Sequence, residues 1–293
     1  MSNAAAHHES GEGSKPTLYV VATPIGNLGD VSLRALDVLK SVDAVAAEDT
    51  RITARLLNHY GITNRMIALH EHNEKRMAPQ LLEHLAAGRS VALVSDAGTP
   101  AISDPGALVV AAALSQGYRV VPVPGANAAI TALSAAGLSA QHYLFYGFLP
   151  ARGAERRREL AALVDLPYAL VFYEAPHRVV DSIADLRAAF GDARRIVIAR
   201  ELTKLFESIH ACALGEAVAW TEADANRRKG EFVLIVEGQP AMPSGEDRAQ
   251  SQHVLEALLS ELPLRQAVAL ATKITGGKRN ELYELALKLK GEP

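Results

Sequence analysis

Residues 90–106 of this chain, SVALVSDAGTPAISDPG, decide its fold. The first half is a short apolar run, which predicts a buried strand over Ser90–Asp96. The second half, Ser95–Gly106, is built almost entirely of small, turn-forming or acidic residues, and a helical pattern follows at Ala107–Gln116. A strand, a small-residue loop and a helix in this order are typical of α/β proteins, whose ligands bind beyond the carboxyl ends of the strands.

The same alternation extends to both sides of this stretch. Glycines at the expected helix ends, among them Gly61 and Gly117, support it. The pattern predicts a mainly parallel sheet with strands at Leu18–Thr23, Ala44–Glu48, Met66–Leu69 and Arg119–Val123, and helices at Val31–Ser41, Thr53–Tyr60, Glu74–Ala87 and Asn127–Ala136.

A second set of strands follows, with fewer helical patterns and with spacings that favour hairpins. These strands are expected at Tyr143–Leu149, Ala169–Glu174, Arg195–Glu201, Ser208–Cys212 and Glu231–Glu237. Three short helical patterns end the chain, at Val254–Ser260, Leu264–Thr272 and Arg279–Leu289. We therefore expect a disordered tail (1–16), an N-terminal α/β domain (17–124), a second α/β domain with a mixed sheet (125–238), a linker (239–252) and a small helix-turn-helix-like module (253–293).

Composition excludes several classes of protein. The 293 residues carry a net charge of −3, which disfavours a general nucleic-acid coat, so contacts with RNA must come from local basic patches. One cysteine, Cys212, allows neither an internal disulfide nor a cysteine-based zinc site. Without a long apolar run or a signal peptide, the chain is expected to be a soluble cytoplasmic protein without a membrane partner.

The loops that end the first strands could hold a nucleoside. Pro24–Asp30 is not a G-x-G-x-x-G loop, which disfavours a nicotinamide cofactor, and Ser95–Gly106 lacks the lysine of a P-loop. Free backbone groups in the second loop can bind the amino-acid and adenine ends of a nucleoside ligand, and Asp96 or Asp104 can offset a positive charge.

Ionisable residues also follow strands of the second half, in Phe172–Arg178 and Ala199–Lys204. Together with Glu48–Arg51 they indicate a polar cleft, although each alone could equally be a structural hydrogen-bonding residue. His70-Glu71-His72 has no matching third ligand, so we expect a solvated loop and no metal site.

These motifs resemble the class III, tetrapyrrole-methylase-fold methyltransferases, and within them the enzymes that act on small-subunit ribosomal RNA. The resemblance runs from about Thr17 to the C-terminus. It rests on six motifs in order: Ala22–Asp30, Glu48–Arg51, His70–Glu74, Ser95–Gly106, Tyr173–Arg178 and Lys229–Val233. The first loop departs from the G-x-G-P-G-D pattern of the cobalamin-pathway members, which disfavours a porphyrin-like substrate.

The resemblance implies a two-domain α/β homodimer that binds S-adenosylmethionine and methylates the ribose 2′-oxygen of a cytidine in the decoding region of 16S ribosomal RNA, as free RNA or in the 30S subunit. The implied cofactor-binding positions are Pro24, Asp96, Ala97, Gly98, Thr99, Pro100, Ile102, Ser103, Gly125, Ala126, Ala128, Phe148, Tyr173, Glu231 and Phe232.

A ribose hydroxyl is a weak nucleophile, so its proton must be accepted or relayed, or its pKa lowered. The candidates for accepting or relaying the proton are Glu174, His177, Glu201 and Lys204. Arg178 and Arg200 complete the catalytic set, and they, like Arg51, are suited to binding phosphates through two hydrogen bonds. Further RNA contacts are expected from Arg152, Arg156, Arg157, Lys273, Lys278 and Arg279.

Two other functions remain open at this point. A methyltransferase of the same fold could act on a tetrapyrrole or on a modified protein side chain, which changes the acceptor and keeps the donor. The chain could also be an RNA-binding factor without catalytic activity, which would have no affinity for S-adenosylmethionine.

Overall fold

The computed structural model describes residues 15–138, 142–239, 245–277 and 279–290. Its first sheet has five parallel strands in the order β3-β2-β4-β1-β5. They are β1 (Thr17–Val21), β2 (Ala44–Ala47), β3 (Met66–Ala68), β4 (Val91–Val94) and β5 (Arg119–Val123). The predicted strands are confirmed within one or two residues at each end. The predicted tail, except for residues 15 and 16, lies outside the described residues.

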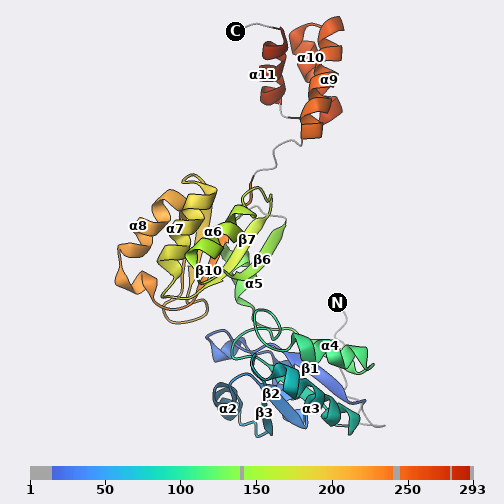
Figure 1. Ribbon diagram of the computed structural model, residues 1–293, viewed down its shortest axis with the longest axis vertical. Coiled ribbons are helices and arrows are strands. Elements are labelled where there is room, and N and C mark those ends of the chain that lie inside the picture. The colour runs from blue at the N-terminus through green and yellow to red at the C-terminus, as the bar shows by residue number, and fades with distance from the viewer. Residues whose placement is uncertain (1–14, 139–141, 240–244, 278, 291–293) are drawn as a thin grey trace. The chain divides into compact units, whose positions relative to one another are not determined.

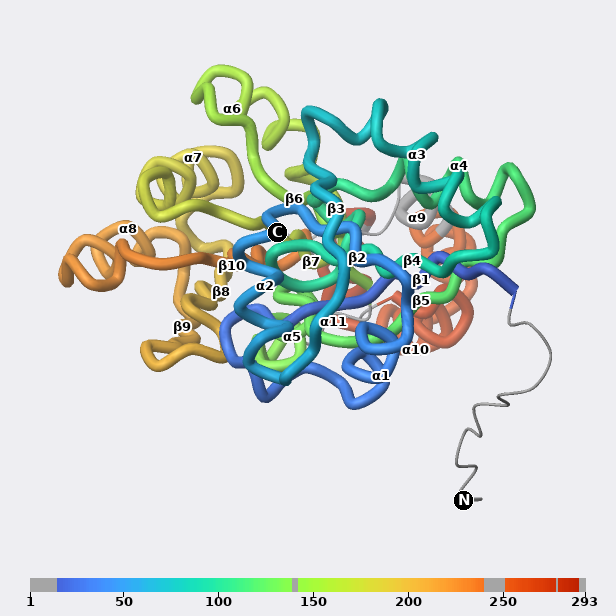
Figure 2. Tube along the Cα trace, turned by 90° about the horizontal axis from the view of Figure 1, so that it is seen from below, coloured from blue at the N-terminus to red at the C-terminus, as the bar shows by residue number. Residues whose placement is uncertain are grey.

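Helices cover both faces of this sheet. Apolar residues of α1 and α2 pack with one set of alternate strand residues, including Val45 and Val94, and those of α3 and α4 pack with the other set, including Ala46 and Leu93. In Figure 2, α3 and α4 lie on the opposite side of these strands from α1. The helices are α1 (Leu33–Ser41), α2 (Thr50–His59), α3 (Glu74–Ala86) and α4 (Ala107–Ser115), and a 3₁₀ turn at Leu28–Asp30 precedes α1.

The second sheet is mixed, as predicted, with the order β6-β7-β10-β8-β9. Its first pair is parallel, and β7, β10, β8 and β9 follow as antiparallel neighbours. The strands are β6 (Tyr143–Phe148), β7 (Ala169–Glu174), β8 (Arg195–Arg200), β9 (Ser208–Ala213) and β10 (Phe232–Val236). The expected hairpin is formed by β8 and β9.

Helix α5 (Ala128–Ala135) packs its alanines against residues such as Val171 and Val233 on one face of the second sheet. Three further helices connect its strands, and Figure 1 shows them side by side. They are α6 (Gly153–Ala161), α7 (Val179–Phe190) and α8 (Leu214–Glu222), with a 3₁₀ turn at Ala225–Arg228. The second half is therefore richer in helix than the sequence predicted, because α6 buries only Arg156 and Leu160 and so lacks an apolar stripe.

The C-terminal unit comprises residues 165–167 and 238–293. Its helices α9 (Gly245–Glu261), α10 (Leu264–Thr275) and α11 (Arg279–Lys290) enclose a small core of Leu255, Val268, Ala271, Leu282 and Ala286. Residues 245–252 of the predicted linker are helical, because charged and polar residues occur in helices as well as in loops. Within the described ranges, no helix is long and apolar enough to cross a membrane.

Candidate functional site

Two loops meet at the carboxyl ends of the adjacent strands β1 and β4. The N–H of Thr23 donates to the carbonyl of Gly98 at 2.8 Å, and the N–H of Gly98 donates back to Thr23 at 3.0 Å. The buried hydroxyl of Thr23 also donates to the carbonyl of Ser95 at 3.0 Å. The chain leaves β1 toward β2 and leaves β4 toward β5 on the other side. This reversal is the place where open α/β sheets bind their ligands.

The loop 95–106 has an unusual backbone. Ala101 and Ser103 have φ angles of 66° and 65°, in the left-handed region that residues with a Cβ avoid. Its end is held by the buried carboxylate of Glu74, whose Oε1 accepts hydrogen bonds from the N–H groups of Gly106 and Leu108, both at 2.9 Å. The small residues that mark Ser95–Gly106 in the sequence therefore form a loop of fixed shape.

A second strained loop, 201–207, joins β8 and β9. Glu201 and Thr203 have φ angles of 51° and 67°, and with the two residues of loop 95–106 they are the only non-glycine residues with positive φ in the described ranges. Arg200 clamps this loop, since its Nε donates to the carbonyl of Lys229 at 2.7 Å and a terminal nitrogen donates to that of Phe206 at 2.9 Å. Left-handed conformations cost about 1–3 kcal/mol each and cluster at functional sites.

A cavity of about 310 Å³ is lined by residues of loop 95–106 and of loop 201–207. Cavities of roughly 300–1,000 Å³ hold most small ligands and cofactors. Its walls come from both sheets and are formed by Ile25, Ala97, Gly98, Thr99, Ile102, Ser103, Asp104, Asn127, Ala128, Phe148, Tyr173, Glu174, Ala175, Pro176, Ala199, Leu202, Lys204, Glu231, Phe232 and Val233.

Aromatic rings form one wall of the cavity. The ring of Tyr173 lies edge-on to that of Phe148, with 5.5 Å between their centroids, and to that of Phe145 at 4.9 Å. The Tyr173 hydroxyl accepts a hydrogen bond from the N–H of Ala129 at 3.3 Å. Burial raises the pKa of Tyr173 above its usual value, so the phenol keeps its proton at neutral pH. This wall offers aromatic faces and edges against which the ring of a ligand can pack.

Acidic groups gather at the loop 95–106 side of the cavity. Burial, together with the nearby carboxylates of Glu48 and Asp96, raises the pKa of Asp104 to about 6. Burial also raises the pKa of Glu48 at the end of β2. The carboxylate of Asp96 is engaged with the backbone, because its Oδ1 accepts from the N–H of Asp49 at 2.8 Å.

A lysine ion pair also belongs to the cavity lining. Lys204 Nζ lies 2.8 Å from Glu201 Oε1 and 2.5 Å from Glu231 Oε2. Burial alone would lower the pKa of Lys204, but the hydrogen bonds to both carboxylates outweigh it and raise this pKa. A Cβ added to Gly26 would lie 2.4 Å from Lys204 Cγ, so only glycine fits beneath this side chain.

Ten of the predicted cofactor-binding residues line the cavity, and five do not. Of the latter, Gly125 packs so closely that a Cβ would lie 2.9 Å from that of Ala22. Ala126 accepts a hydrogen bond from the hydroxyl of Thr99 at 3.2 Å through its carbonyl. The ten are Ala97, Gly98, Thr99, Ile102, Ser103, Ala128, Phe148, Tyr173, Glu231 and Phe232, and the other three outside the lining are Pro24, Asp96 and Pro100.

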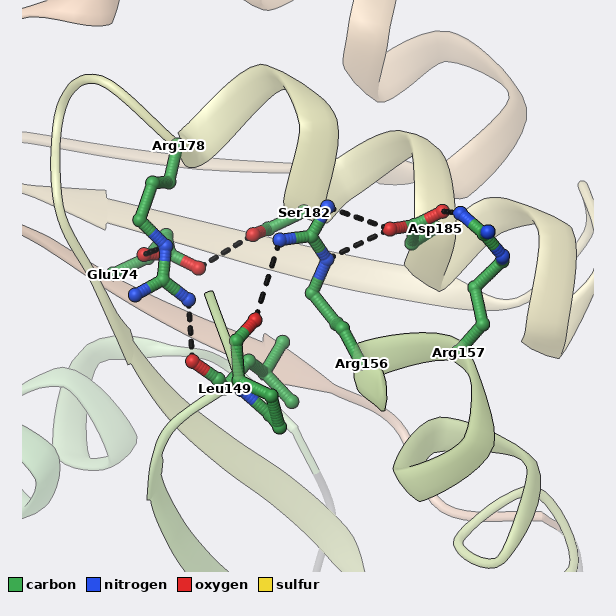
Figure 3. A network of polar contacts seen from close by, with 8 residues as sticks. Leu149, Arg156, Arg157, Glu174, Arg178, Ser182 and Asp185 are labelled. Atoms are coloured by element: carbon green, nitrogen blue, oxygen red, sulfur yellow. Dashed lines mark hydrogen bonds and ion pairs between the residues drawn. The ribbon is translucent and has the colours of Figure 1, made fainter. Parts of the chain in front are cut away.

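Glu174 lines the cavity but serves the surrounding structure. Its Oε2 accepts from Ser182 Oγ at 2.5 Å and its Oε1 from the N–H of Ala175 at 2.8 Å. Arg178 Nε lies 3.3 Å from Oε1, and a terminal nitrogen of Arg178 donates to the carbonyl of Leu149 (Figure 3). Glu174 and Arg178, two of the predicted catalytic residues, are thus bound within a buried network. The sequence shows that they are charged but not that they contact one another.

Arg156, predicted to contact RNA, is also buried. Its Nε donates to Asp185 Oδ2 at 2.7 Å, and a second nitrogen lies at the same distance from that oxygen (Figure 3). The side chain is 6% exposed, so a phosphate could reach it only by disrupting this pair. Its neighbour Arg157 is 59% exposed and lies at the rim of the network.

The remaining predictions fall outside the cavity lining. Of the catalytic set, His177 is exposed, Arg200 is the backbone clamp described above, and Glu201 is the partner of Lys204. Arg51 is 85% exposed and paired with Asp49, whose pKa its hydrogen bonds lower. Arg152, Lys273 and Arg279 are exposed, and Lys278 lies outside the described residues.

Sequence reasoning left several lining residues out of the site. The sequence indicates Asp104 only as a possible counter-charge, although its place in loop 95–106 is a usable signal. Leu202 and Val233 lie in the stretches Ala199–Lys204 and Lys229–Val233 that the sequence singles out, but apolar residues of this kind also fill cores, so neither is marked as a lining residue. The others are Ile25, Ala175, Pro176 and Ala199. No group of three or more His, Cys, Asp or Glu in the described ranges is arranged to hold a metal ion.

Known proteins of similar sequence share this organisation. The family described as Tetrapyrrole (Corrin/Porphyrin) Methylases matches residues 17–218, and the RsmI C-terminal HTH domain matches residues 245–290. Two relatives called Ribosomal RNA small subunit methyltransferase I are each 52% identical. The protein from Escherichia coli O157:H7 aligns over 97% of this chain and 99% of its own length, and that from Pseudomonas aeruginosa over 95% and 99%.

Solved structures show the same fold at lower identity. The methyltransferase CobJ is 20% identical, with a TM-score of 0.58, over 79% of this chain and 98% of its own. Uroporphyrin-III C-methyl transferase from Thermus thermophilus, complexed with S-adenyl homocysteine, is 19% identical, with a TM-score of 0.54, over 75% and 97%. The predicted two-sheet α/β fold is thereby confirmed.

The family follows from the length and strength of these matches, which include both the two-sheet unit and the C-terminal helices. The chain belongs to the tetrapyrrole methylase family and, within it, to the group of ribosomal RNA small subunit methyltransferase I.

Proposed function

We propose that this chain transfers the methyl group of S-adenosylmethionine to the ribose 2′-oxygen of a cytidine in the decoding region of 16S ribosomal RNA. The observation that carries the proposal is the cavity between loop 95–106 and the second sheet, in a chain 52% identical to relatives named for small-subunit ribosomal RNA. The proposed acceptor is the RNA free or within the 30S subunit, and the proposed working form is a cytoplasmic homodimer.

The cavity fits the chemistry of S-adenosylmethionine. The rings of Phe148 and Tyr173 suit the adenine. The loop around Gly98 approaches without a side chain, and its φ of 79° is one that glycine adopts freely. When bound, this donor supplies an electrophilic methyl group on a sulfonium.

The residues of the chain contribute mainly by positioning. Fixed loops on both sides of the cavity can hold two reactants in line and exclude water, which accounts for much of the acceleration of a displacement reaction. Lys204 keeps its positive charge at neutral pH, since its pKa is raised, and it therefore does not act as the proton acceptor.

RNA would be held outside the cavity. Arg152 and Arg157 are exposed near the start of α6, and Lys273 and Arg279 are exposed in the C-terminal unit. Contacts of this kind bind phosphates without reading sequence and weaken as salt rises.

The central experiment incubates the purified protein with labelled S-adenosylmethionine and either 30S subunits or free 16S RNA, followed by mass mapping. We expect one ribose-methylated cytidine in the decoding region. Methylation of a base, of a tetrapyrrole or of a protein side chain would refute the acceptor. Absence of S-adenosylmethionine binding in calorimetry would favour a non-catalytic RNA-binding factor instead.

The role of the C-terminal unit is tested with Lys273→Ala combined with Arg279→Ala. We expect a higher KM for the RNA substrate and a weaker dependence of binding on salt, with unchanged affinity for S-adenosylmethionine. Lys288→Ala, which also removes an exposed cation from α11, is the matched control. An unchanged KM in the double variant would remove this surface from the RNA interface.

A further inference from the structure

We propose that Asp104 is the residue that accepts the proton of the ribose hydroxyl during methyl transfer. This inference rests on the function proposed above and assigns the proton transfer within that site. It starts from the position of Asp104, which lines the cavity next to Ser103, where the backbone is left-handed. The carboxyl group is therefore placed by a loop of fixed shape.

The other titratable groups of the cavity lining are already engaged. Both oxygens of Glu174 accept hydrogen bonds within the buried network. Glu231 is paired with Lys204, which holds its own proton more strongly than a free lysine. Tyr173 is a phenol whose pKa burial raises, so it has no free base at neutral pH.

Groups near the cavity but outside its lining are no better placed. Burial by itself would raise the pKa of Glu201, but the hydrogen bonds from Lys204 and from the backbone of Glu231 outweigh it and lower this pKa. His177 is exposed on the surface. Among the lining residues of the described chain, Asp104 is the carboxyl without an ion-pair partner.

The surroundings of Asp104 give it the basicity that this role requires. Burial and the carboxylates of Glu48 and Asp96 raise its pKa to about 6, although a hydrogen bond with Ser95 opposes them. Tyr173, from β7, faces it as a neutral phenol whose own pKa it helps to raise. A general base works best when its pKa is near the working pH, and an ordinary aspartate, at about 3.9, is far below it.

The step balances without a further reactant. The ribose oxygen forms a bond to the methyl carbon as the carbon–sulfur bond breaks, and the electron pair of that bond stays on sulfur as a neutral thioether. The hydroxyl proton passes to a carboxylate oxygen of Asp104 and from there to water. The carboxylate is regenerated for the next turnover.

The first test replaces the base by an isosteric amide in the full-length protein. We expect Asp104→Asn to lower kcat by about 10²- to 10⁴-fold and to leave the calorimetric affinity for S-adenosylmethionine unchanged. Asp37→Asn, an identical change on the exposed side of α1, is the matched control. Loss of S-adenosylmethionine affinity in Asp104→Asn would assign this carboxyl to binding and overturn the proposal.

The second test uses the neighbouring carboxyl. In the wild type, kcat/KM should rise with pH through an apparent pKa near 6, because kcat/KM reports the groups of the free protein. Glu48→Gln removes a like charge and should move this limb toward acid, and NMR titration of Asp104 in the free protein should show the same shift. A limb that stays in place while the NMR pKa moves would overturn the proposal. A wild-type protein that methylates no ribose would instead defeat the proposed function, whatever the NMR titration shows.

Discussion

The buried pair Arg156–Asp185 gives the sharpest prediction about stability. We consider Arg156→Met, which keeps an unbranched side chain and removes the guanidinium. The substitution deletes two contacts of 2.7 Å with Asp185 and a weaker hydrogen bond to the carbonyl of Pro150 at 3.4 Å. It leaves a carboxylate that is only 13% exposed, with Arg157 as its remaining partner at 3.3 Å.

The magnitude follows from burial. Removing one partner of a buried ion pair costs about 3–5 kcal/mol, because the other charge stays desolvated. Arg157→Met removes a cation that is 59% exposed, for which about 0–1 kcal/mol is expected. In a unit of this size each kcal/mol lowers Tm by about 2–4 °C, so Arg156→Met should melt roughly 6–20 °C below the wild type.

A double variant shows how much of the lost stability comes from the unpaired carboxylate of Asp185 and how much from the loss of the Arg156 contacts themselves. Replacing the second charge as well, in Arg156→Met with Asp185→Leu, removes the uncompensated carboxylate. Buried pairs replaced by apolar residues of similar volume often regain stability. We therefore expect the double variant to be more stable than Arg156→Met alone.

The assay can use the natural fluorescence of the chain. Its single tryptophan, Trp220, lies in α8, which packs against the helix α7 that carries Asp185. Unfolding followed at this residue reports on the relevant half. The reasoning is refuted if Arg156→Met unfolds within about 1 kcal/mol of the wild type, or if Arg157→Met costs as much. A selective loss of RNA affinity in folded Arg156→Met would restore its predicted RNA contact.

Three further outcomes are expected. Gly230→Ala places a Cβ 2.4 Å from the Glu201 side chain at a φ of 91°, so it should cost about 1–3 kcal/mol and weaken S-adenosylmethionine binding, as thermal shift and calorimetry would show. Ser182→Ala leaves Glu174 Oε2 without its hydrogen bond and should lower the free energy of unfolding in urea by about 1–3 kcal/mol. Raising the pKa of Asp104 from 3.8 to about 6 means that the folded state binds more protons than the unfolded chain between these values, so wild-type stability should fall as pH rises through this window. Asp104→Asn lacks this loss and should be more stable than the wild type above pH 6 by about 1 kcal/mol after screening by solvent, with no gain below about pH 4, as unfolding curves against pH would test.

The sequence predicted the strands well because parallel and central strands are buried on both faces. Runs such as Val91–Val94 and Phe232–Val236 are apolar throughout, and they are too short for a buried helix, so they are predicted as strands. Helix α6, with the sequence GAERRRELA, has no such signal, since its buried positions are Leu160 and an arginine. Charge in a sequence does not say whether the side chain is buried.

The site was predictable in part for a similar reason. Loop 95–106 was found because small residues follow a strand end, a local pattern. The network around Glu174 includes the contact of Arg178 with Leu149, and the pKa of Asp104 depends on Glu48. The members of each pair are far apart in the sequence and meet only after folding. The sequence shows which residues are present, but it does not show which of them contact one another in the folded protein.

The position of β10 has a consequence for how the protein is made. This strand comes last among the ten in the chain, yet it lies between β7 and β8 in the middle of its sheet. During synthesis β7 and β8 must therefore wait with open edges until Phe232–Val236 leaves the ribosome, while the first sheet already has all its strands. A nascent chain stalled before this point would have a complete first sheet and a gap in the second, and it would lack the part of the cavity lining that Phe232 and Val233 provide.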